Sequence, residues 1–168
     1  LRERVTLLAG LPASTIDRVI AERITLNPGA KALVWTMRAN GAHTILVSGG
    51  FTAFTDSISK MAGFNETRAN ELIIERGKLA GRVKEPILGR SAKLATLEDA
   101  IVRLGITAEQ TVAVGDGAND LAMIRRAGLG VAYHAKKAVA EAAAARIDHT
   151  DLTALLYAQG YKRHQFVE

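Results

Sequence analysis

Two segments of this chain combine residue types that could bind a phosphate group or a metal ion. Residues 48–51 read SGGF and follow an apolar, β-branched run at 43–47, and residues 115–120 read GDGAND and follow a second such run at 111–114. A hydroxyl followed by two glycines lets backbone N–H groups approach an anion closely. Two aspartates in one tight turn offer the oxygen ligands that Mg²⁺ prefers. The sequence therefore places candidate anion and metal ligands at the ends of two expected strands.

Each segment also has a purely structural interpretation. Ser48 is a suitable N-cap for a helix after a glycine-rich turn, and Asp116 and Asp120 could belong to a solvated turn. Two carboxylates this close repel each other unless a cation or a counter-charge is present, which favours the metal site. The second segment is not the GxGxxG of dinucleotide sites, because Asp120 stands where the third glycine would be.

Lys93 is a third candidate, at the start of an expected helix. A helix N-terminus disfavours a cation unless an anion shares the position, so Lys93 is a candidate phosphate ligand. An ordinary surface lysine is the alternative.

The elements that would position these residues alternate between helix and strand. We expect residues 1–28 to be helical with a break at Pro12 and an N-cap at Ser14, and a β-hairpin at residues 71–83. The other expected helices are 30–39, 54–62, 94–104, 119–127, 136–145 and one from 151; the other expected strands are 43–47, 111–114, 129–132 and 146–148. This alternation predicts an α/β fold: a parallel sheet with helices on both faces and ligand-binding residues at the carboxyl ends of its strands.

Composition excludes several classes of function. The chain has 168 residues, enough for one domain, and no cysteine, which removes disulfides, thiol nucleophiles and zinc knuckles. Its 22 basic and 17 acidic residues give a net charge of +5, but the charges are interleaved, so we expect no nucleic-acid partner. No apolar run approaches the roughly 20 residues of a membrane span, and we expect a cytoplasmic protein without a membrane partner.

Taken together, these motifs resemble the second, third and fourth motifs of the haloacid dehalogenase superfamily of phosphohydrolases. SGGF at 48–51, Lys93 and GDGANDL at 115–121 occur in the expected chain order. GDGxND also occurs in P-type ATPases, so SGGF is the narrower signal. Further similarity extends over nearly the whole chain, at residues 1–5, 10–12, 77–79 and 132–136.

The resemblance implies a Rossmannoid parallel sheet with helices on both faces, together with the remnant of a small helical cap. Residues 1–28 would be the C-terminal part of the cap, and residues 29–168 the α/β core without its first strand. The implied cofactor is Mg²⁺. The implied substrate is O-phospho-L-serine, hydrolysed to serine and phosphate in the last step of serine biosynthesis.

The resemblance also implies roles for the candidate residues. Asp116 would bind Mg²⁺, and Asp120 would support this site without binding the metal directly. Ser48 and the N–H of Gly49 would hold the oxygens of the transferring phosphoryl group, and Lys93 would bridge that group and the nucleophile.

Two further residues would contact the substrate, Asn119 and, on the cap, Arg4. A bidentate guanidinium suits the carboxylate of phosphoserine. Without the resemblance, Arg4 would be interpreted as a surface arginine of a helix.

One part of the family pattern is absent from the chain. The first motif, Asp-x-Asp-x-Thr/Ser after an apolar strand, supplies the nucleophile and the general acid/base, and none of the aspartates here has that context. We therefore expect the chain to be the C-terminal part of a phosphatase, inactive and poorly folded alone, whose missing strand lies between those ending at Val47 and Val114. The alternatives are a non-catalytic phosphate- or nucleotide-binding module and another phosphatase of the superfamily.

Overall fold

The computed structural model describes residues 1–89 and 91–167, and within them the strands form two parallel groups and one antiparallel hairpin. The first group is β1 (Ile45–Phe51) with β2 (Glu66–Asn70); the second is β5 (Val112–Gly115), β6 (Leu129–Tyr133) and β7 (Ala145–Ile147), in this order; the hairpin is β3 (Leu72–Glu75) with β4 (Lys78–Val83). Among the described residues, β1 and β5 are not hydrogen-bonded to each other.

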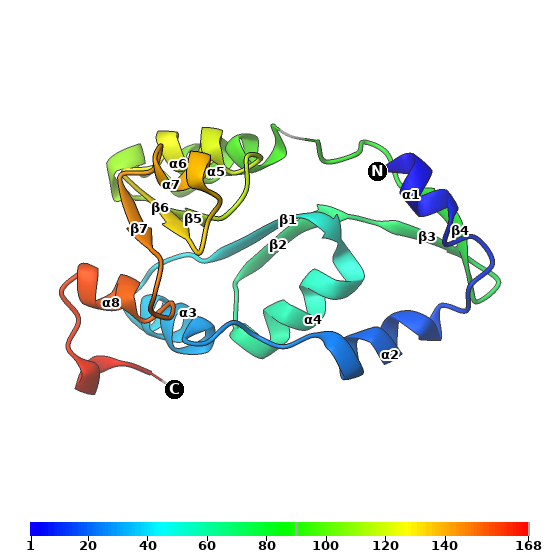
Figure 1. Ribbon diagram of the computed structural model, residues 1–168, viewed down its shortest axis with the longest axis horizontal. Helices are drawn as coiled ribbons and strands as arrows, with labels where there is room; N and C mark the ends of the chain where they lie inside the picture. Colours follow the sequence, from blue (N-terminus) through cyan, green and yellow to red (C-terminus); the bar gives the residue numbers. More distant parts are fainter. Residues whose placement is uncertain (90, 168) are drawn as a thin grey trace.

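Helices cover both faces of the parallel strands. The α-helices are α1 (Arg2–Thr6), α2 (Ser14–Arg23), α3 (Ala30–Ala39), α4 (Thr52–Ala62), α5 (Ala92–Leu104), α6 (Leu121–Arg126), α7 (Lys137–Ala140) and α8 (Ala154–Ala158), and short 3₁₀ helices lie at Ala108–Gln110 and Arg163–Gln165. Figure 1 shows α5 and α6 on one side of the strands and α3, α4 and α8 on the other. The predicted α/β fold class is confirmed.

The core shows why both faces must be covered. Successive residues of a strand point to opposite faces, and on β6 both Val131 and Ala132 are buried. Ala132 packs with Ile124 of α6 on one face. Val131 packs with Leu155 of α8 on the other. Such two-sided burial produces the continuous apolar runs from which the strands were predicted.

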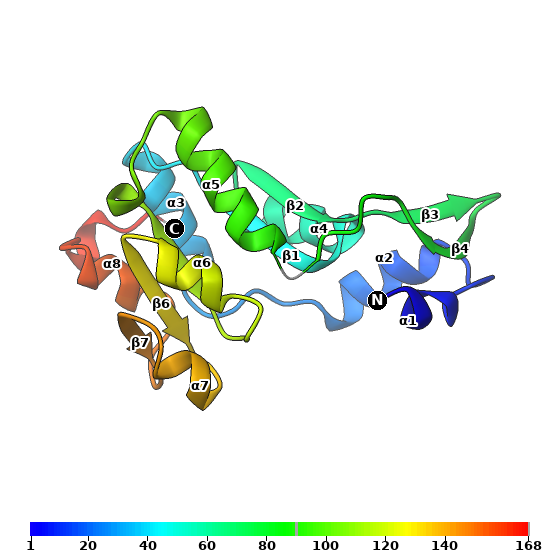
Figure 2. The same ribbon diagram turned by 90° about the horizontal axis from the view of Figure 1, so that it is seen from above.

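The hairpin extends away from the parallel strands, and the N-terminal helices lie beside it (Figure 2). Helix α1 packs against β4 and buries Val5, and Pro12 forms an isolated antiparallel bridge with Lys78. The predicted hairpin and the break at Pro12 are therefore confirmed. The division into a cap at 1–28 and a core at 29–168 stays a prediction.

Several expected elements have different limits. Ser14 is the first residue of α2 rather than its N-cap, which is Ala13. The alanine-rich segment 136–145 forms only α7, because Ala145 already pairs with Val131 in β7 and this pairing overrides the helix propensity of alanine. Strand β2 was not expected: its sequence ETRAN carries no apolar alternation, and pairing with β1 forms it.

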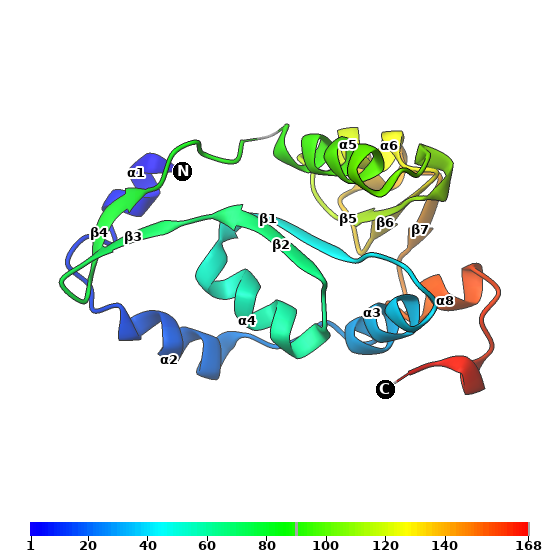
Figure 3. The same cartoon turned by 180° about the vertical axis from the view of Figure 1, so that it is seen from behind.

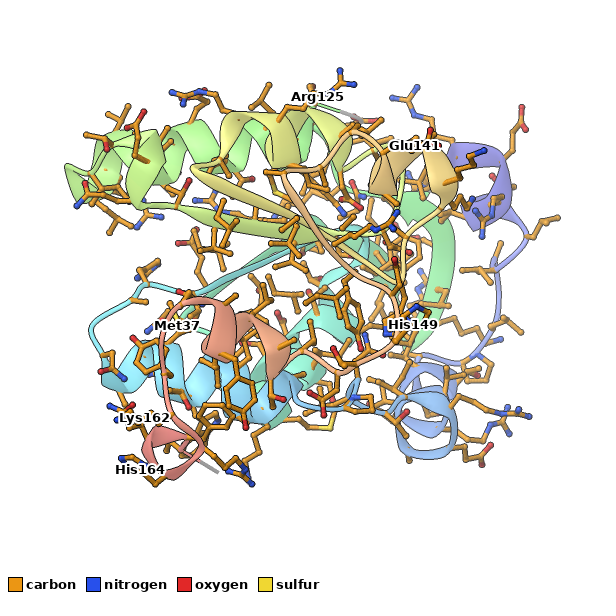
Figure 4. All side chains as sticks on the ribbon, turned by 60° about the vertical axis from the view of Figure 1, so that its left-hand side comes forward. Met37, Arg125, Glu141, His149, Lys162 and His164 are labelled. Atoms are coloured by element: carbon orange, nitrogen blue, oxygen red, sulfur yellow. The ribbon has the colours of Figure 1, made fainter. Side chains whose placement is uncertain are left out.

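Among residues 1–89 and 91–167, no helix is both long enough and apolar enough to cross a bilayer. Positive side chains are dispersed: in Figure 4 Arg125 projects from α6 at one side of the molecule, whereas Lys162 lies beyond α8 at the other.

Candidate active site

The SGGF segment lies inside a strand, not in the turn expected from its glycines. Strand β1 continues through Ser48 to Phe51, which pairs with Asn70, and its register with β2 shifts between Val47 and Phe51. The Ser48 hydroxyl accepts a hydrogen bond from the N–H of Gly50 at 3.0 Å. Strand β2, which the sequence pattern did not reveal, pairs with Val47 and Phe51 on either side of residues 48–50.

A buried asparagine, not singled out from the sequence, holds this segment in place. Asn70 is 2% exposed, and its Nδ2 donates to the carbonyl oxygens of Gly49 (3.1 Å) and Gly50 (3.3 Å). Its Oδ1 accepts the N–H of Leu88 at 2.8 Å. Asn70 therefore joins the SGGF segment to the loop that leads into α5. A lone asparagine in a polar segment carries no sequence signal of this role.

Replacing Asn70 with alanine is expected to lower the free energy of unfolding by about 1–3 kcal/mol, because the Leu88 N–H and two carbonyl groups lose a buried partner. Denaturant unfolding of the protein expressed from its natural gene measures the change. Asn70→Asp keeps the acceptor for Leu88 but loses the donor, and it should also be destabilised. An Asn70→Ala protein as stable as the wild type would show that the three bonds contribute nothing.

The second segment is organised by the side chain of Asp120, the N-cap of α6. Its Oδ2 accepts the N–H groups of Asp116 at 3.1 Å and Gly117 at 3.0 Å, and its Oδ1 accepts a hydrogen bond from Nζ of Lys93. Asp120 is 1% exposed and the Lys93 side chain 17%. The counter-charge expected beside the paired aspartates is therefore Lys93, and the pair fixes both the turn and the lysine.

Gly115 allows this arrangement. A Cβ atom at Gly115 would lie 2.4 Å from the Cβ of Asp120, closer than any real contact. The absence of a side chain at Gly115 therefore allows the Asp120 side chain to pack against the backbone at the end of β5.

A small cavity brings these segments together. Its lining comprises Val47, Ser48, Gly49, Leu88, Gly89, Ala92, Lys93 and Asn119. Four of the seven predicted site residues share it: Ser48, Gly49, Lys93 and Asn119. A hydroxyl, an ammonium group and a side-chain amide, with the glycine backbone, suit a small anion such as phosphate.

The other three predicted residues are placed differently. Asp120 is buried and paired with Lys93, and it is not among the residues that line the cavity. Asp116 is exposed on the same turn, and its backbone carbonyl accepts the N–H of Lys136 at 3.3 Å. Arg4 is exposed on α1, apart from the cavity lining.

The donor set fits Mg²⁺ in part. Within the described part of the chain, no group of three or more His, Cys, Asp or Glu side chains could enclose a metal ion. Both oxygens of Asp120 are already hydrogen-bonded, which leaves the exposed carboxylate of Asp116 as the available ligand on this turn. One carboxylate is compatible with Mg²⁺, which usually keeps several waters and binds through one or two carboxylates and a substrate phosphate.

Parallel strands with helices on both faces, beside a cavity lined by a hydroxyl, an ammonium group and glycine backbone, are typical of phosphate-binding α/β proteins. Residues 2–125 match the haloacid dehalogenase-like hydrolases, and the chain belongs to this family. The resemblance stated from its motifs is thereby confirmed.

Within this family, the chain is similar in sequence to phosphoserine phosphatases. It is 44% identical over 165 residues to the phosphoserine phosphatase of Streptomyces coelicolor and 46% identical over 160 residues to that of Albidiferax ferrireducens. These alignments cover 98% and 93% of this chain but 40% and 68% of the two relatives. A solved structure of a phospho-aspartyl intermediate analogue of phosphoserine phosphatase superimposes with a TM-score of 0.86 at 39% identity, over 94% of this chain and 75% of that one.

Proposed function

We propose that the protein to which this chain belongs is a phosphoserine phosphatase, which hydrolyses O-phospho-L-serine to L-serine and phosphate. The observation that carries the proposal is the cavity where Ser48 and Gly49 of β1 meet Lys93 of the first turn of α5. The names of the relatives support the choice of substrate.

In this proposal the phosphate group of the substrate enters the cavity. The Ser48 hydroxyl and the Gly49 N–H donate to phosphoryl oxygens, and Nζ of Lys93 neutralises charge that develops on them. Asn119 contacts the substrate from the opposite turn. Mg²⁺, bound by Asp116, would supply further neutralisation of phosphoryl charge.

The nucleophile in this proposal is an aspartate on a strand between β1 and β5, outside the residues of this chain. Its carboxylate attacks phosphorus, and serine leaves after a second carboxyl group protonates its oxygen. Water then hydrolyses the aspartyl-phosphate to give inorganic phosphate. The absence of hydrogen bonds between β1 and β5 in the described residues supports the position of this strand.

The substrate carboxylate would be bound by Arg4. Its guanidinium can donate two parallel hydrogen bonds, and α1 carries it on the side of the hairpin.

Phosphate release tests the proposal. The natural full-length protein should release phosphate from O-phospho-L-serine when Mg²⁺ is present and stop when the metal is chelated. Phosphate release from other monoesters but not from O-phospho-L-serine would indicate another phosphatase of the family. Binding of phosphate without any turnover would indicate a non-catalytic module. Either outcome would contradict the proposal.

A further inference from the structure

An ion pair connects α1 to the loop between β4 and α5. Nη2 of Arg2 donates to Oε1 of Glu85 at 2.6 Å, and Oε2 of Glu85 accepts the N–H of Ile87 at 3.1 Å. Figure 3 shows this loop passing beside α1 on its way to α5. One carboxylate therefore holds both the first residue of α1 and the backbone of the loop.

The same loop reaches the cavity. Leu88, next along the chain, donates its N–H to Asn70, which in turn holds the carbonyl of Gly49. Leu88 and Gly89 both line the cavity. A series of hydrogen bonds and one peptide unit thus runs from α1 to the segment that carries Ser48.

Helix α1 depends on such external contacts. It has five residues, Val5 is the one it buries, and its N-cap residue makes no side-chain hydrogen bond. A helix this short is not stable by itself. The hydrogen bond from Arg2 holds the pKa of the Glu85 carboxyl below its usual value.

We propose that Glu85 is a positioning residue: through Arg2 it fixes α1, and with it Arg4, relative to the phosphate cavity, and so sets the affinity for substrates that carry a carboxylate. This inference rests on the proposed function, because Arg4 is the residue that would bind the carboxylate of O-phospho-L-serine. Loss of Glu85 should therefore change KM for such substrates and not the rate of the chemical step.

Steady-state kinetics of the natural full-length protein test the proposal with Glu85→Gln, Arg2→Gln and the charge-swapped Arg2→Glu/Glu85→Arg. Each single variant should raise KM for O-phospho-L-serine about two- to fivefold, the range that an exposed ion pair allows, with kcat unchanged. KM for p-nitrophenyl phosphate, which has no carboxylate, should stay the same. The swapped pair should restore the wild-type KM.

Hydrogen exchange gives a readout independent of activity. Amide exchange in α1 should be about two- to fivefold faster in Glu85→Gln than in the wild type, because the helix loses its connection to the loop. The matched control is Glu75→Gln. It breaks the 2.7 Å pair between Arg82 and Glu75, which joins the two hairpin strands and includes no residue of α1. It should change neither KM nor exchange in α1.

Two results would overturn the proposal: an unchanged KM together with unchanged exchange in α1, or an equal loss on both substrates, which would place the effect in the loop rather than in α1. A wild-type protein that does not hydrolyse O-phospho-L-serine would instead contradict the proposed function. The exchange comparison would then still decide whether Glu85 holds α1.

Discussion

Replacing Lys93 with alanine is expected to lower kcat for O-phospho-L-serine by about a thousandfold or more, a loss of about 4 kcal/mol of transition-state stabilisation. Its ammonium group lines the cavity with Ser48 and Gly49, and among the lining residues within 1–89 and 91–167 it is the one cation. Steady-state phosphate release measures the loss. A near-normal kcat would show that Lys93 has no role in the reaction.

Lys93 also has a structural partner, which the experiment must separate from catalysis. Without the lysine, the carboxylate of Asp120 is buried and loses its counter-charge, at a cost of about 3–5 kcal/mol of stability. The double variant Lys93→Ala/Asp120→Asn removes that charge while an amide oxygen remains to accept the N–H groups of the turn. We expect it to recover stability in a thermal melt but not kcat. Recovery of both would show that Lys93 acts only as the partner of Asp120.

Replacing Asp116 with alanine is expected to abolish Mg²⁺-dependent turnover and leave the fold intact. The side chain is exposed, and the bonds that hold the turn use the backbone N–H and carbonyl of Asp116. The stability change should therefore stay within about 0.5 kcal/mol, as for other surface substitutions. Phosphate release across a Mg²⁺ titration, with a thermal melt of the same sample, measures both effects.

Asp17→Ala is a matched control, because it removes an exposed carboxylate from α2. It should change neither turnover nor the Mg²⁺ dependence. An Asp116→Ala protein that still responds to Mg²⁺ like the wild type would move the metal ligand elsewhere.

The sequence predicted the parts of this fold that depend on local pattern. The run that became β6 is apolar because both of its faces are covered. Helix α5 ends at Leu104 with Gly105 as its C-cap, as the sequence indicated. The sequence singled out Ser48 and Lys93 as candidate phosphate ligands, and the structure brings both to one cavity, although Ser48 lies inside β1 and Lys93 in the first turn of α5.

The features that the sequence did not predict depend on contacts between segments that are distant in the chain. Strand β2 is polar, and it is a strand because β1 pairs with it. Asn70 holds the SGGF segment only because that pairing places it opposite Phe51. The sequence could not show which group balances the charge of Asp120, since a bound metal ion and a lysine side chain would do so equally well.

A crystal structure of the natural full-length protein with Mg²⁺ and inorganic phosphate tests the central claim most directly. The phosphate is predicted to lie in the cavity within hydrogen-bonding distance of Ser48 Oγ, the Gly49 N–H and Lys93 Nζ, with the metal on the carboxylate of Asp116. Phosphate and metal bound elsewhere, with this cavity unliganded at saturating concentrations of both, would contradict the account.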